Sequence, residues 1–249
     1  MTYQPFEARV LPLIFYYIGL AIASMILAVK MVMKWKQRKV QPPLLMATIF
    51  AIFVVALSML AAGLADSAMN GAYKDLYRFS LPFGYTMIIL ADIVLYKFGI
   101  VMTNRGKNAF MTIVVIGIVL AAVLFLPWNW WGYPDADIVD QVSIRLYSTL
   151  ALIVYSYIIY ITIASVCHKA LADAKDPVAR AGLKLMSWAM ICMILFFLMF
   201  VFDTLLIVIL KHPGYSEFVY AAWVFAVAFY VLMYLSVVMP ECFVKRLRK

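Results

Sequence analysis

Two aspartates interrupt the long apolar runs of this sequence, and they are its strongest candidates for chemistry. Asp92 lies about eleven residues from either end of the run 81–102, and Asp203 lies about seven residues from the C-terminal end of the run 185–210. At 1.5 Å per helical residue, Asp92 falls near the middle of a bilayer and Asp203 about 10 Å deep. Ionisable groups in hydrocarbon are costly and mark functional sites. If the two helices are neighbours, we expect the carboxylates to share a proton or a cation; the alternative is a carboxyl that bonds to a nearby group and serves packing.

Tyrosines form the second group of candidates, because a buried phenol needs a hydrogen-bond partner. Tyr155 and Tyr160 share one apolar run with Ser156, and Tyr230 lies in the last run. We predict that Tyr155 and Tyr230 contribute to a polar ligand or proton site with Asp92. The alternative is that these tyrosines only pack in the core or lie in the interfacial belt.

Metal and cofactor chemistry find little support in the sequence. The two histidines, His168 and His212, fall at opposite ends of the predicted helices, and the three cysteines have no paired spacing. The methionine stripe 186, 190 and 193 is more typical of gap filling than of a copper path. Neither HExxH nor GxSxG is present. We therefore expect no metal, no cofactor and no enzymatic activity.

A bilayer is needed to position these residues, because the composition does not suit a water-soluble domain. The chain has 249 residues, of which 67% are hydrophobic and 13% charged, with a mean hydropathy of +0.98. A hydrocarbon core of about 30 Å needs roughly 20 apolar residues per helix, and continuous runs exclude barrel strands. We predict an all-α membrane protein, one domain over 1–249, with seven transmembrane helices at 10–32, 44–65, 81–102, 110–127, 146–167, 185–210 and 218–239.

The distribution of basic residues predicts the orientation of the bundle. Fourteen Lys and Arg residues lie on the first, third and fifth connections and the C-terminal tail, whereas five lie on the opposite side. The positive-inside rule then places the N-terminus outside and the C-terminus in the cytoplasm. The rule also accounts for the net charge of +9 without nucleic acid. We expect a multi-pass protein of the cell membrane whose main partner is the lipid bilayer.

The fifth connection is the best candidate for contact with a protein partner. Asp176 followed by Pro177 is typical of a helix N-cap with proline at the first helical position, so the sixth helix should begin well before the lipid. Arg180 and Lys184 are then four residues apart on one cytoplasmic face. We predict a short cytoplasmic hairpin whose two basic residues contact a partner. The alternative is a solvated helix end.

The same connection also carries a resemblance to a known family. Residues Asp176-Pro177-Val178-Ala179-Arg180 lead into a long sixth helix, and the seventh helix ends in Met239-Pro240. In these features the second half of the chain resembles the seven-helix sensor regions that precede some prokaryotic histidine kinases. The resemblance implies a sensor or receptor-like module. Because the sequence contains no kinase domain, its signal would pass to a separate partner.

Three functions follow from these observations. The leading hypothesis is a stand-alone seven-helix sensor that detects a small or lipophilic ligand in the outer half of the bundle and acts through its cytoplasmic connections. The first alternative is a proton- or ion-coupled secondary transporter that uses Asp92. The second is a non-catalytic subunit of a membrane complex, with close helix contacts at pairs of small residues. Those pairs are Gly19/Ala23, Ser58/Ala62 and Ala61/Ala65.

Overall fold

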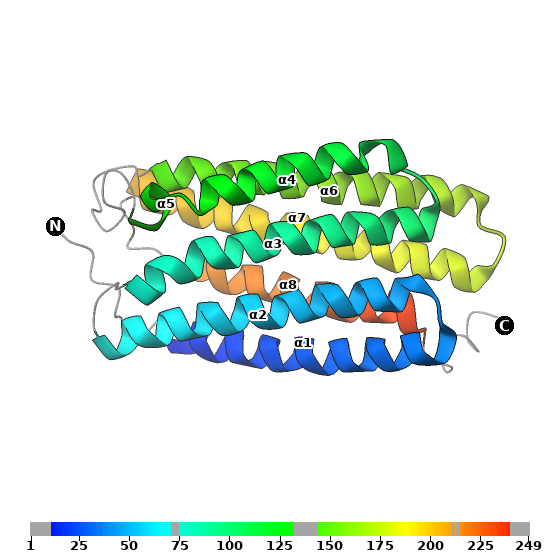
Figure 1. The fold of residues 1–249 in the computed structure, drawn as a ribbon, viewed down its shortest axis with the longest axis horizontal. Helices are drawn as coiled ribbons and strands as arrows, with labels where there is room; N and C mark the ends of the chain where they lie inside the picture. The colour runs from blue at the N-terminus through cyan, green and yellow to red at the C-terminus, as the bar shows by residue number, and fades with distance from the viewer. Residues whose placement is uncertain (1–10, 71–74, 132–143, 211, 213–214, 240–249) are drawn as a thin grey trace.

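The chain folds into long helices. The computed structural model describes residues 11–70, 75–131, 144–210, 212 and 215–239, and these residues include no strand. The seven long helices are α1 (Leu11–Arg38), α2 (Gln41–Asn70), α3 (Asp75–Thr103), α4 (Phe110–Leu124), α6 (Ile144–Asp173), α7 (Pro177–Leu210) and α8 (Glu217–Val238), shown in Figure 1. A 3-10 turn (Lys107–Ala109) precedes α4, and the short helix α5 (Pro127–Trp131) follows it.

Seven apolar helices match the seven predicted runs, and each stretch is long and apolar enough to cross a membrane. These seven helices support the predicted multi-pass membrane protein. Most helices extend beyond the predicted bounds; α1 continues to Arg38 because its last turn is basic and suits a helix C-terminus. The fourth run is the exception, since α4 ends at Leu124 and Pro127 begins a new helix.

The start of α7 follows the predicted cap. The Asp176 carboxylate accepts a hydrogen bond of 3.0 Å from the backbone N–H of Ala179, and the Asp176 carbonyl accepts one of 3.0 Å from the N–H of Arg180. Pro177 is the first residue of the helix. The connections after α1, α3 and α6 gather at one end of the bundle, and the α6–α7 turn reaches farther than the α1–α2 connection (Figure 1).

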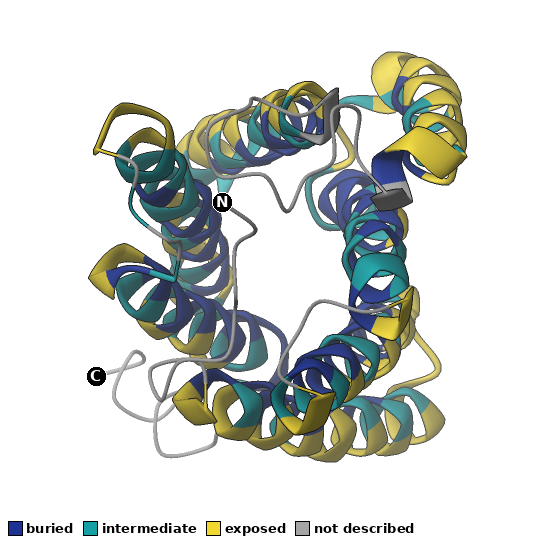
Figure 2. Cartoon of the chain, turned by 90° about the vertical axis from the view of Figure 1, so that its left-hand side faces the viewer, coloured by how far each residue is buried: buried dark blue, intermediate teal, exposed yellow. Residues whose placement is uncertain are grey.

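The helices form a closed ring made of two halves. Within the first half, α2 packs between α1 and α3, and within the second half, α7 packs between α6 and α8. The halves meet along two lines, where α3 contacts α6 and where α1 contacts α8. We call these lines the α3/α6 seam and the α1/α8 seam. Helix α4 lies against α3 and α6, and buried residues face the inside of the ring (Figure 2).

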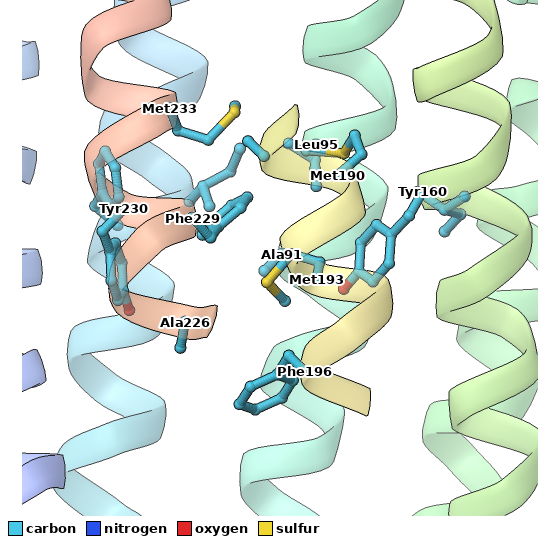
Figure 3. Close-up of a cluster of buried hydrophobic side chains, with 14 of the residues drawn as sticks. Ala91, Leu95, Tyr160, Met190, Met193, Phe196, Ala226, Phe229, Tyr230 and Met233 are labelled. Carbon is cyan, nitrogen blue, oxygen red and sulfur yellow. The ribbon is translucent and has the colours of Figure 1, made fainter. Parts of the chain in front are cut away.

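Apolar side chains from both halves fill the interior of the ring. Met186, Met190 and Met193 are all buried in this core, where flexible thioethers suit irregular gaps between helices. The aromatic ring of Phe53 on α2 packs edge-on against Phe229 on α8, with centroids 6.3 Å apart. Figure 3 shows the middle of the core, with Ala91, Leu95, Tyr160, Met190, Met193, Phe196, Ala226, Phe229, Tyr230 and Met233.

Candidate functional site

Asp92 lies on α3 at the α3/α6 seam, with only 2% of its surface exposed. The Ser156 hydroxyl donates a hydrogen bond of 2.6 Å to Asp92 Oδ2, and the Tyr160 hydroxyl donates one of 2.7 Å to Asp92 Oδ1. Both donors belong to α6 and are fully buried. Because they are four residues apart, one face of α6 presents both hydroxyls to the carboxyl group. We call these three residues the Asp92 cluster.

The surroundings of the Asp92 cluster are apolar and closed. The ring of Tyr160 stacks on Phe197 of α7, with centroids 6.2 Å apart and an angle of 22° between the planes. The Tyr160 side chain points from α6 into the core, toward Ala91 and Met193 (Figure 3). With exposed fractions of 0–2%, the three residues leave almost no surface for water to touch. The cluster is therefore an enclosed polar site in the middle of the bundle.

This arrangement suits a change in protonation. As a carboxylate, Asp92 accepts hydrogen bonds from both hydroxyls. When one of its oxygens carries a proton, that oxygen becomes a donor, and the facing hydroxyl must turn to accept. Since α3 and α6 belong to different halves, a proton on Asp92 alters the bonds that join the halves. Among the described residues, no group of three His, Cys, Asp or Glu side chains is placed to hold a metal ion.

Tyr155 and Tyr230 were predicted to join this site, but each has a different partner. The Tyr155 hydroxyl donates a hydrogen bond of 3.1 Å to the carbonyl of Ile113 on α4. The Tyr230 hydroxyl accepts one of 3.0 Å from Ser24 on α1. Neither bond reaches Asp92, so Tyr155 joins α6 to α4 and Tyr230 joins the α1/α8 seam.

Asp203 is also buried, but its partner is the residue that precedes α8. Its Oδ1 accepts a hydrogen bond of 2.8 Å from the backbone N–H of Ser216, the residue that precedes α8. Asp203 is 7% exposed. The two aspartates therefore have separate partners, on α6 and before α8, and Asp203 joins α7 to the start of α8.

Ser156 and Tyr160 are the residues that sequence reasoning undervalued. Both lie in the same predicted helix as Tyr155, but Tyr155 was named as the site tyrosine instead of Tyr160. The useful signal was the four-residue spacing of two hydroxyls at the depth of a buried carboxyl group, because such residues share one helical face. Tyr155 is one residue from Ser156, about 100° around the helix, and so points elsewhere.

A second polar feature lies in the core near the N-terminal end of α8. The ring of Trp223 packs edge-on against Tyr17 of α1 at 4.8 Å and against Phe196 of α7 at 5.3 Å. Trp223 is only 6% exposed, and no acceptor among the described residues reaches its indole N–H. A buried donor without an acceptor is costly. It is a candidate position for an acceptor atom of a bound molecule.

The predicted partner-contact residues lie toward the other end of the bundle from Trp223, near the α6–α7 turn. Arg180 and Lys184 are both exposed, on the first two turns of α7. Nearby, Asp173 at the end of α6 forms a 2.6 Å ion pair with Arg105, which follows α3. The α3/α6 seam is therefore joined a second time, close to the α6–α7 turn.

The Asp92 cluster is thus enclosed between the two halves of the ring, on α3 and α6. The exposed basic residues lie on the hairpin that follows α6, at one end of the bundle. The likeness to histidine-kinase sensor regions stays a prediction. No protein-family model, no curated protein and no solved structure matches this chain.

Proposed function

We propose that this protein is a seven-helix sensor module of the cell membrane, with the Asp92 cluster as its two-state element and the α6–α7 hairpin as its output. The observation that carries the proposal is the pair of hydrogen bonds from Ser156 and Tyr160 to Asp92, because they join the two halves of the ring. No enzymatic reaction is assigned to the chain.

Helix α6 connects the proposed input with the proposed output. Tyr160 and Asp173 are thirteen residues apart on α6, which corresponds to about 20 Å along a continuous helix. In the proposed switch, the altered hydrogen bonds favour a different position of α6 relative to α3, and the far end of α6 carries that shift to the hairpin. A switch of this kind needs only a local change in bonding and a bistable element. Arg180 and Lys184 would then meet the partner.

We place the ligand of the proposed sensor at Trp223, in the core near the start of α8. In the proposed sensor, an apolar molecule with an acceptor atom binds beside Trp223, whose indole N–H has no acceptor among the described residues. Phe196 on α7 contacts this ring at 5.3 Å, and Phe197, the next residue, stacks on Tyr160. Consecutive residues of α7 thus link the ligand position with the Asp92 cluster.

Transport is the rival function, and it requires water to reach the enclosed Asp92 cluster. A carrier that binds its ion at Asp92 has to expose the carboxyl group to water from one side. Here the three residues are 0–2% exposed. Reconstituted into liposomes with a pH-sensitive dye inside, the wild-type protein should produce no proton flux beyond that of Asp92→Asn. A flux that Asp92→Asn abolishes would support the transporter instead.

Titration of the carboxyl group tests the proposed input. Infrared difference spectra of the wild-type protein should contain a carboxylic C=O band whose intensity changes with pH. The band should be absent in Asp92→Asn and should shift in frequency in Tyr160→Phe, which removes one hydrogen bond. Asp203→Asn is the matched control, since it alters a buried aspartate that bonds to a backbone N–H. Identical pH-dependent spectra for wild type and Asp92→Asn would refute the proposal.

The proposed orientation places the α6–α7 hairpin in the cytoplasm. Cysteine introduced at Met69, which is 81% exposed at the end of α2, should react with an impermeant thiol reagent added outside the cell. Cysteines introduced at the exposed positions Gln41 and Ala172 should not react. The opposite pattern would reverse the orientation drawn from the basic residues.

A further inference from the structure

The α1/α8 seam is open toward the outside of the bundle. A groove of about 950 Å³ lies between the two helices, a volume within the usual range of ligand sites, about 300–1,000 Å³. Its walls are largely apolar, and they include Phe15, Gly19 and Ala23 of α1 and Val227, Val231 and Leu235 of α8.

Small residues and one hydrogen bond account for the groove. A Cβ atom added to Gly19 would meet nothing within 4 Å, so this part of α1 leaves space that α8 does not fill. Ser24 and Tyr230 bond to each other across the seam at 3.0 Å, which satisfies the tyrosine hydroxyl. The remaining surface is apolar and faces the hydrocarbon of the membrane. An empty groove would forfeit dispersion contacts, which an acyl chain restores.

One end of the groove carries positive charge. The ammonium of Lys30 lies 5.7 Å from the ring centroid of Tyr234, and Tyr234 lines the groove. Lys34 follows one turn later on α1. Within the described residues, no carboxylate pairs with Lys30. A cation at the rim of an apolar groove is complementary to an amphiphile with an anionic headgroup and a hydrocarbon tail.

We propose that this groove binds an acyl chain of an anionic phospholipid from the bilayer, with the lipid phosphate beside Lys30. The chain lies along Gly19 and Ala23, and the Tyr234 ring separates it from the headgroup. This site is independent of the proposed sensor function, because it uses the α1/α8 seam and none of the residues of the Asp92 cluster.

Photocrosslinking in vesicles of known composition tests the lipid site. The full chain is reconstituted in phosphatidylcholine vesicles that contain some phosphatidylglycerol, and in separate arms one of the two lipids carries a diazirine in its acyl chain. Mass spectrometry of peptides should place phosphatidylglycerol adducts on α1 and α8 at the groove. Lys30→Gln should lower these adducts about fivefold relative to phosphatidylcholine, the factor that corresponds to about 1 kcal/mol for one basic residue near an anionic lipid.

Lys97→Gln is the matched charge control. The Lys97 ammonium lies 5.1 Å from the ring centroid of Phe110, a geometry similar to that of Lys30, but Phe110 does not line the groove, whereas Tyr234 does. This variant should leave the groove adducts unchanged. Equal labelling by both lipids, or equal loss of labelling in Lys30→Gln and Lys97→Gln, would overturn the proposal.

Filling the groove tests the acyl-chain contact separately. Gly19→Phe should abolish the adducts, and Val231→Phe from the facing wall is the second variant in case the first does not fold. Ala51→Phe, on an exposed position of α2, controls for an added ring on the lipid-facing surface. Retention of the adducts in a folded filling variant would contradict the site. Crosslinks between two protein chains at these residues, in place of lipid adducts, would assign the groove to a second copy of the chain.

Discussion

The two seams of the ring are built in opposite ways. At the α3/α6 seam, a buried carboxyl group takes hydrogen bonds from Ser156 and Tyr160, and α4 covers the outside. At the α1/α8 seam, the Ser24–Tyr230 bond leaves a groove open along one side. The comparison shows how one bundle can enclose a polar cluster at one seam and leave an apolar groove at the other.

This difference follows from the kind of residue that each seam places at its surface. The α3/α6 seam has Gly117 of α4 packed closely against it, so that a Cβ atom there would come within 2.6 Å of the Tyr155 hydroxyl. The α1/α8 seam has Gly19, where a Cβ atom would meet nothing within 4 Å. The same residue type therefore marks close approach in one place and free space in the other.

Substitution of these two glycines by alanine should give the largest difference in stability between the two seams. Gly117→Ala should lower the free energy of unfolding by up to about 3 kcal/mol, because the methyl group displaces Tyr155 and breaks its bond to Ile113. Gly19→Ala should change it by about 0.5 kcal/mol or less. Thermal unfolding in detergent, followed by circular dichroism, measures both. Equal destabilisation by the two substitutions would show that the seams are packed alike.

Removal of single hydroxyls should give an intermediate effect. Tyr160→Phe leaves one oxygen of the buried Asp92 carboxyl group without its donor, which should cost about 1–2 kcal/mol. Ser24→Ala should cost only about 0.6 kcal/mol, the average for a hydrogen bond between membrane helices. The same unfolding assay applies. A larger loss of unfolding free energy for Ser24→Ala than for Tyr160→Phe would show that the stronger hydrogen bond lies at the α1/α8 seam.

The ion pair between Arg105 and Asp173 should contribute least to the stability of the bundle. Its side chains are 45% and 69% exposed, so a double-mutant cycle with alanine should give a coupling free energy of about 0–1 kcal/mol. Added salt should reduce that coupling. A coupling well above this range, or one insensitive to salt, would indicate that the end of the α3/α6 seam is more rigid than its exposure suggests.

The helices themselves are predictable from the sequence because the bilayer imposes their length and polarity. The start of α7 is predictable too, since Asp176 and Pro177 act locally as a cap. The partners of Asp92 are not, because they depend on which helices are adjacent and on the rotation of α6. A rotation of one residue, about 100°, decides whether Tyr155 or Ser156 faces the carboxyl group.

The groove between α1 and α8 could not be predicted from the sequence either. Gly19 and Ala23 have the spacing of a pair that brings helices together, and they were predicted as helix contacts of a membrane-complex subunit. In the structure both residues line open space between α1 and α8. A small residue permits close approach, but only the packing of the rest of the seam determines whether the approach happens.

The distance between the two halves, measured at the end of the bundle that carries the α6–α7 turn, tests the central claim most directly. Spin labels are attached to cysteines introduced at Gln37 of α1 and Ala172 of α6, both exposed, in a chain whose own three cysteines are replaced by serine. Double electron–electron resonance is recorded across the pH range of the infrared titration. We predict that the distance distribution changes with pH in this background and in its Asp203→Asn variant but not with Asp92→Asn. A distribution that stays the same at every pH, or one that changes equally with Asp92→Asn, would contradict the claim that a proton on Asp92 alters how the halves are joined.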